Sequence, residues 1–134
     1  MLLLGARELM NLLVADASAL FALVDGEDPH HAKAMEEARR QRPFVVPSEI
    51  LGETLAVLQW RRGRAASVAF LEMLRRMPHA RVGATRSAVV EQSVLSASRP
   101  GPLSYPDWIV VHTCRATGSQ PWTFDDDIRR AVKA

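Results

Sequence analysis

Residues 12–26 read Leu-Leu-Val-Ala-Asp-Ala-Ser-Ala-Leu-Phe-Ala-Leu-Val-Asp-Gly, and this stretch decides the fold. The short apolar run Leu12–Ala15 predicts a buried strand that ends at Asp16. The apolar segment Ala17–Val24 then predicts a short helix, closed by the turn Asp25-Gly26. A short strand that is apolar throughout and passes directly into a helix is typical of a parallel sheet covered on both faces.

The same alternation of strands and helices continues to the end of the chain. The further elements that we expect are a helix over 30–41, a strand over 44–46, a helix from 47 or 48 to 61, a helix over 65–77, a strand over 80–82, a helix to 98 with Thr85 as its N-cap, a helix over 106–117, a strand over 121–124 and a helix over 126–132. This order predicts an α/β fold, a three-layer α/β/α sandwich with a central, mostly parallel sheet.

The length of 134 residues suits a single domain over residues 1–134. Residues 1–9 would be an N-terminal extension if Met10 rather than Met1 is the native start. The single cysteine, Cys114, cannot form an internal disulfide, and no Cys or His cluster has the spacing of a zinc site. No apolar run approaches the ~20 residues of a membrane-spanning helix, and the first residues do not resemble a signal peptide. We therefore expect a cytoplasmic protein without a membrane segment.

Three acids are expected at one edge of the predicted sheet. Asp16 follows the first strand, Asp125 follows the last, and Asp107 begins a helix between them. In parallel α/β sheets ligands bind beyond the carboxyl ends of the strands, so this edge is the expected functional site. Each acid also has a structural interpretation, because Asp16 and Asp125 could be helix N-caps and Asp107 completes a capping-box pattern with Ser104.

Glu53 is a fourth candidate. Its spacing from Ile50, Val57 and Trp60 predicts that its carboxylate lies on an apolar stripe of a helix. A buried, unpaired carboxylate is costly and needs a cation, although a glutamate at the edge of the stripe could also reach solvent. Glu49, one turn earlier, is expected to be structural, because the helix dipole stabilises a carboxylate in the first turn.

Together the four acids predict a shared divalent cation. Carboxylates that converge repel one another unless they are protonated or bridged by a cation, and oxygen ligands suit Mg²⁺ or Mn²⁺ rather than zinc. Water held by such an ion is a nucleophile for a phosphodiester. With four of the 15 acids assigned to metal, 11 acids remain against 17 basic residues, which suits a polyanionic substrate.

Four segments resemble the motifs of the PIN domain. Residues 14–18 (VADAS) resemble its opening Asp-x-Ser/Thr, and residues 47–53 (PSEILGE) resemble its second block, with Glu53 as the helical acid. Residues 103–110 (LSYPDWIV) resemble its third block, and residues 123–125 (TFD) resemble its closing Thr-x-Asp. Their order and spacing cover nearly the whole chain, and the most similar subgroup is the VapC-like toxins of type II toxin–antitoxin modules.

This resemblance implies a Mg²⁺- or Mn²⁺-dependent endoribonuclease that cleaves RNA, forms a homodimer and is silenced by a cognate VapB-like antitoxin. The residues that it implies as catalytic and metal-binding are Asp16, Glu53, Asp107 and Asp125. Ser18 and Thr123 match the small hydroxyl residues of the family and would orient ligands or water. Asp126 and Asp127 are expected to be solvated or capping, although the run of three acids leaves open which of them faces the site.

Two residues depart from the family pattern. Trp108 and Cys114 stand where smaller residues are common; we expect both in the core, with base stacking as the alternative for Trp108. The Arg61-Arg62-Gly63-Arg64 cluster is expected to be a solvated helix face, with contact to RNA or antitoxin as the alternative.

Other functions stay open on the sequence alone. An inert PIN-like module could bind RNA or protein without turnover, and a PIN nuclease could act in RNA maturation. A receiver-like domain would need clustered early acids and a late lysine beyond a strand, whereas here the acids are dispersed and Lys133 is terminal. A histidine acid–base ribonuclease would use two of the four histidines, but no spacing favours a pair. Those four residues are His30, His31, His79 and His112.

Overall fold

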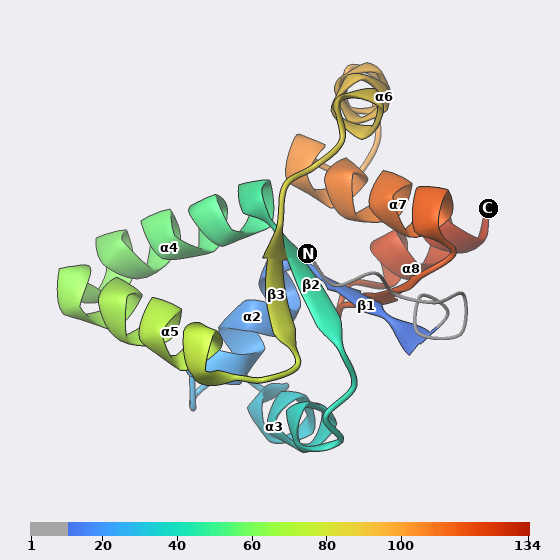
Figure 1. Cartoon of the computed structure of the whole chain (residues 1–134). Helices are drawn as coiled ribbons and strands as arrows, with labels where there is room; N and C mark the ends of the chain where they lie inside the picture. The colour runs from blue at the N-terminus through green and yellow to red at the C-terminus, as the bar shows by residue number, and fades with distance from the viewer. Residues whose placement is uncertain (1–10) are drawn as a thin grey trace.

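The computed structural model describes residues 11–134, so the expectations for residues 1–9 and for the starting methionine lie outside it. In this range four strands form one sheet in the order β3-β2-β1-β4, with seven helices around it (Figure 1). The elements are β1 (Leu13–Ala15), α2 (Ala17–Val24), α3 (His31–Arg39), β2 (Phe44–Pro47), α4 (Ser48–Arg62), α5 (Arg64–Arg76), β3 (Ala80–Gly83), α6 (Ser87–Ala97), α7 (Tyr105–Thr117), β4 (Gln120–Trp122) and α8 (Asp126–Lys133).

All strand pairs of the sheet are parallel, as predicted. Leu13 of β1 pairs with Phe44 of β2 on one side and with Gln120 of β4 on the other. Val14 in the middle of β1 is fully buried, because helices cover the sheet on both faces. In Figure 1, α2 to α5 lie on one side of the sheet and α7 and α8 on the other, with α6 packed on the outside of α7. The three-layer α/β/α sandwich is thus confirmed.

The element boundaries differ from the sequence prediction by one or two residues, and two of these differences are instructive. Thr85 is not the N-cap of α6; Arg86 occupies that position. The Thr85 hydroxyl instead donates a hydrogen bond to the Glu49 carboxylate at 2.6 Å, which ties the end of β3 to the start of α4. The last strand ends at Trp122 rather than Phe124, because the Thr123 side chain turns toward Asp16.

The start and the end of α7 are both determined by residues next to them in the sequence. Ser104 and Asp107 form the predicted capping box at the start of α7. Gly118 ends α7 in the left-handed conformation at φ 71°, which glycine adopts at little cost, and the chain then enters β4. Among the described residues no helix has the length and apolar character that crossing a bilayer requires.

Candidate functional site

The site lies where the strand order of the sheet changes direction. β1 has β2 on one side and β4 on the other, so the chain leaves β1 on one side of the sheet and returns beside it at the end. Crevices at such switch points, beyond the carboxyl ends of the strands, are the usual binding sites of parallel α/β folds. Asp16 directly follows β1 and Thr123 directly follows β4, so both lie beyond the carboxyl ends of these two neighbouring strands.

Asp16 is buried and densely hydrogen-bonded. Its side chain is the N-cap of α2, accepting a bond from the Ala19 backbone N–H at 2.9 Å. The Ser18 hydroxyl lies 2.7 Å from Oδ1, and the Thr123 hydroxyl donates to Oδ2. The structural role as a helix cap is therefore confirmed, and it holds the carboxylate in one orientation at the switch point.

Ser18 and Thr123 form a small hydroxyl network beside Asp16. Their hydroxyl oxygens lie 3.3 Å apart. The backbone N–H of Phe124 donates to Ser18 Oγ at 3.0 Å, and that of Asp125 donates to Thr123 Oγ1 at 2.9 Å. The loop after β4 is thereby fixed to the loop after β1, and both hydroxyls orient the Asp16 carboxylate.

Three of the four predicted acids act on one another electrostatically. Burial raises the pKa of Asp16 above its ordinary value, and the charge of Asp107 raises it further. The pKa of Glu53 is also raised, by desolvation first and then by the charges of Asp107 and Asp16. None of the ion pairs among residues 11–134 involves any of these three acids. The three carboxylates therefore repel one another without a basic partner in the described chain.

Asp107 and Glu53 reach this group from different helices. Asp107 lies in the first turn of α7, where its carboxylate accepts a bond from the Ser104 backbone N–H at 2.8 Å. Glu53 lies on α4 and is exposed, so the prediction of a carboxylate on a buried stripe is wrong. The buried residues of α4 are Ile50, Thr54 and Leu58. Glu53 lies beside that stripe, at its edge, which leaves its charged group open to solvent.

Asp125 is placed differently from the other three acids. Its side chain caps α8 by accepting a bond from the Asp127 backbone N–H at 2.9 Å. Its charge is not among the causes that shift the pKa of Asp16 or Glu53. Asp126 pairs with Arg129, and Asp127 pairs with Arg130. The catalytic and metal-binding roles of all four acids stay predictions, and Asp125 lacks the electrostatic link that joins the other three.

The carboxylates of the candidate acids are the type of ligand that a hard divalent cation prefers, but they do not lie close enough together to coordinate one as they stand. A divalent cation would relieve the mutual repulsion of these carboxylates. Within residues 11–134, however, no cluster of three or more His, Cys, Asp or Glu side chains is close enough together to hold a metal ion. Ligation by these acids would therefore require side-chain adjustment, which the exposed Glu53 permits more easily than the buried Asp16.

Sequence reasoning missed two contacts near the site. The His30 ring stacks on Phe124, with ring centroids 4.5 Å apart and an interplanar angle of 5°. This stack ties the loop before α3 to the residue that follows Thr123. The bond between Thr85 and Glu49 likewise fixes the loop after β3. Neither contact has a signal in the sequence, because each joins residues far apart in the chain.

The remaining residues that the sequence analysis named are buried or make contacts within the fold. Cys114 is buried as expected, and burial raises the pKa of its thiol to about 12. Trp108 packs against the core and stacks on His112, with ring centroids 5.3 Å apart. His112 also bonds to Ser96 at 2.8 Å, and His31 bonds to the Ala22 carbonyl at 2.7 Å. None of these contacts pairs two histidines.

The raised pKa of Asp16 predicts how stability changes with pH. Because its pKa is higher in the folded state, the folded protein holds this proton more tightly than the unfolded chain. The contribution of protonated Asp16 to the free energy of unfolding is fully present below the pKa of aspartate in the unfolded chain, about 3.9. It is lost as the pH rises through the pKa of Asp16 in the folded protein. In metal-free buffer Asp16→Asn should therefore melt at a higher temperature than the wild type at neutral pH, and the difference should vanish toward about pH 4.

Thermal melts of both proteins across this pH range measure the effect. Asparagine is a good N-cap, so the variant keeps the start of α2 intact. Glu91→Gln is the matched control, because Glu91 is exposed on α6 and its neutralisation should leave the melting temperature nearly unchanged at every pH. A wild type that melts above Asp16→Asn at neutral pH would contradict the picture of a desolvated and repelled carboxylate.

Comparison with known proteins adds an independent observation. A family model described as the PIN domain matches residues 13–134. Among solved structures the chain is similar to Mycobacterium tuberculosis VapC20, described as a Sarcin-Ricin loop cleaving toxin. The TM-score is 0.78 at 26% sequence identity, over 89% of this chain and 94% of VapC20. No curated protein matches the chain significantly.

Proposed function

The chain belongs to the PIN domain family, and from this premise we propose that it is a divalent-metal-dependent endoribonuclease, the toxin of a toxin–antitoxin pair. The observation that carries the proposal is the group of Asp16, Glu53 and Asp107, whose charges act on one another without a basic partner in the described residues. Such a group at the switch point of a parallel sheet is suited to a cation and to the phosphate that the cation attracts.

The proposed metal ligands are the acids of the sequence motifs. Asp16, Glu53 and Asp107 would hold Mg²⁺ or Mn²⁺, with Asp125 as the predicted fourth acid. When bound, the ion would activate a water and stabilise charge on the phosphodiester. Ser18 and Thr123 hold the Asp16 carboxylate in place through their hydroxyl groups. The burial of Asp16 excludes water from its inner side, which strengthens its interaction with a cation.

RNA is the proposed substrate, and a protein antitoxin the proposed inhibitor. VapC20 is a sarcin–ricin loop cleaving toxin, and the chain carries more basic than acidic residues. A VapB-like antitoxin with a basic side chain could neutralise the repelling acids in place of a metal. A homodimer in the cytoplasm is part of the same proposal.

One alternative is an inert PIN-like module that binds RNA or protein without turnover. In its favour, the acids within residues 11–134 do not form a finished metal-ligand cluster. A PIN nuclease of RNA maturation is a second alternative with the same site. Expression without an antitoxin distinguishes the two nucleases, since a toxin should arrest growth and a maturation enzyme should not.

Metal removal tests the proposed chemistry directly. The purified chain, stripped with EDTA and incubated with a ribosomal RNA fragment that carries the sarcin–ricin loop and with a tRNA mixture, should cleave neither RNA. Adding back Mg²⁺ or Mn²⁺ should restore cleavage, because three repelling carboxylates hold no activated water without a cation. Separation of the RNA on denaturing gels gives the readout. Cleavage that survives EDTA contradicts metal dependence, and metal binding without any cleavage favours the inert module.

A further inference from the structure

His30 lies at the start of α3 but does not cap that helix. It occupies the N-cap position, where Ser, Thr, Asp and Asn are the usual residues, and its side chain forms no bond with the helix. The imidazole instead stacks on the ring of Phe124, near the other end of the chain, with the ring centroids 4.5 Å apart and 5° between the ring planes. The helix therefore does not explain where this ring lies, whereas the contact with Phe124 does.

The turn that carries His30 is fixed by its own hydrogen bonds and by α4. The Asp28 carboxylate accepts a bond from the His30 backbone N–H at 2.8 Å. The Asp28 backbone N–H donates to the Asp25 carbonyl at 3.0 Å, and the Asp25 carboxylate pairs with Arg62 of α4 at 3.2 Å. The imidazole thus reaches Phe124 from a turn that is itself held in place.

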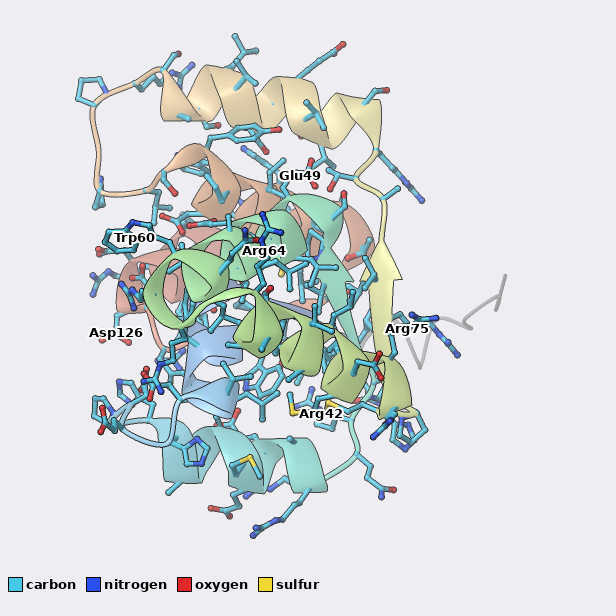
Figure 2. The ribbon with its side chains drawn as sticks, turned by 90° about the vertical axis from the view of Figure 1, so that its left-hand side faces the viewer. Arg42, Glu49, Trp60, Arg64, Arg75 and Asp126 are labelled. Atoms are coloured by element: carbon cyan, nitrogen blue, oxygen red, sulfur yellow. The ribbon has the colours of Figure 1, made fainter. Side chains whose placement is uncertain are left out.

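Phe124 lies in the loop that orients Asp16. Its backbone N–H donates to Ser18 Oγ at 3.0 Å, and the Ser18 hydroxyl donates to Asp16 Oδ1 at 2.7 Å. Thr123, the preceding residue, donates to the other carboxylate oxygen, Oδ2. Figure 2 shows Asp126, the residue at which α8 begins after this loop, on the same side of the molecule as the turn between α2 and α3. Only one hydroxyl group therefore separates the Phe124 backbone from the Asp16 carboxylate.

The ring of His30, rather than its nitrogen atoms, makes the contact with this loop. Phe124 is half-buried and packs against the core, and His30 is exposed. The imidazole thus covers one face of the phenyl ring and shields it from water. Within residues 11–134 the ring nitrogens of His30 form no hydrogen bond. What His30 contributes to the loop is a flat ring at a fixed place.

We propose that His30 is a positioning residue of the acid site: its stack on Phe124 keeps residues 123–125 where Ser18 and Thr123 can orient Asp16. This inference rests on the proposed function, since it concerns how Asp16 would meet a divalent cation. An aromatic pair is worth about 2- to 10-fold in an equilibrium constant, which sets the size of effect that its loss can have on cation binding. A histidine that acts through a ring nitrogen, on the substrate or on a proton, is the competing assignment.

The experiment measures Mn²⁺ binding by isothermal titration calorimetry, which needs no cleavage. His30→Ala and His30→Gln both remove the flat ring and should raise the Mn²⁺ dissociation constant about 2- to 10-fold. His30→Phe keeps a flat ring without nitrogen atoms, so its dissociation constant should stay within about 2-fold of the wild type. His79→Ala is the matched control, because His79 precedes β3 at the opposite edge of the sheet and should leave Mn²⁺ binding unchanged.

A second set of variants tests whether the effect passes through Phe124. Phe124→Leu keeps an apolar side chain but removes the partner ring, and it should raise the Mn²⁺ dissociation constant by a similar factor. In this background His30→Ala should have no further effect, because no stack is left to break. The Mg²⁺ concentration for half-maximal RNA cleavage should follow the same order. A merely structural loss would lower the melting temperature and the rate without moving that concentration.

The outcomes separate the positioning role from the proposed function. If His30→Ala binds Mn²⁺ as tightly as the wild type, the positioning role is wrong while the ribonuclease function stands. If His30→Phe behaves like His30→Ala, a ring nitrogen matters and the stacking role is again wrong. If the wild type neither binds Mn²⁺ nor cleaves RNA, the ribonuclease function and the positioning role are both overturned.

Discussion

Replacing Asp16 with asparagine is expected to lower the rate of RNA cleavage by roughly 10²–10³-fold, the typical effect of removing one electrostatic group from an active site. Asp16 is only 3% exposed and lies among two hydroxyls and a backbone N–H that fix its orientation. The asparagine fills the same space and still caps α2, while the negative charge that would bind the cation is gone. The loss should therefore appear in cleavage and not in folding.

Initial rates of cleavage of the same RNA by the two proteins, at saturating Mg²⁺, provide the measurement. Asp126→Asn is the matched control, because Asp126 is exposed and pairs with Arg129 near the end of the chain. Its rate should stay within about 3-fold of the wild type, as for most surface changes that break an exposed ion pair. If Asp16→Asn retained full activity, the proposed site would be wrong even though the family assignment would stand.

Replacing Thr123 with valine is expected to lower cleavage by about 10- to 100-fold, the usual effect of removing a group that orients a metal ligand. The Thr123 hydroxyl donates to Asp16 and accepts from the Asp125 backbone N–H. Valine keeps the shape but makes neither bond, so Asp16 loses an interaction that lowers its pKa. The carboxylate should then stay protonated up to a higher pH, and the pH profile of cleavage should shift to higher pH.

Thr123→Ser separates the hydroxyl from the methyl group. Serine can form both hydrogen bonds, so this variant should recover most of the activity and restore the position of the pH profile. The profile is the decisive readout, because a mere loss of packing would lower the rate without moving it. Equal activity of the serine and valine variants would show that the hydroxyl does not act through Asp16.

The sandwich could be predicted because its strands have an unambiguous local pattern. Val14–Ala15 in β1 and Phe44–Val46 in β2 are short apolar runs without polar alternation, which only a sheet covered on both faces can bury. The position of Asp16 after β1 followed from that pattern, whereas Thr123 was expected inside the last strand and instead follows β4. Thr85 was predicted wrongly as a helix cap, because its hydroxyl binds a carboxylate 36 positions earlier, which no local pattern encodes.

The prediction for α4 failed for a related reason. Apolar residues at the spacing of Ile50, Val57 and Trp60 define a helix face, but they do not say whether another element covers it. The helix instead buries the stripe of Ile50, Thr54 and Leu58. Glu53 and Trp60 are left exposed to solvent.

The placement of the candidate acids could be predicted in part, whereas their catalytic and metal-binding roles stay predictions. Asp16 and Asp107 were identified as acids near one edge of the sheet, and their capping roles were correctly weighed beside the functional ones. The charges of Asp107 and Asp16 raise the pKa of Glu53, which agrees with the predicted convergence of these acids. Hydroxyls that orient Asp16 come from both ends of the chain, and such distant pairs carry no periodicity that a single sequence displays.

The bond between Asp16 and Thr123 joins residues 107 positions apart, and this has a consequence for synthesis. A ribosome translates β1 early but must reach β4 before the Asp16 carboxylate can receive its second hydroxyl. Proteins fold as they emerge, with early segments waiting for late partners. A nascent chain that ends before β4 therefore carries Asp16, Glu53 and Asp107 without the hydroxyl of Thr123, so the proposed site can be completed only after β4 has been translated.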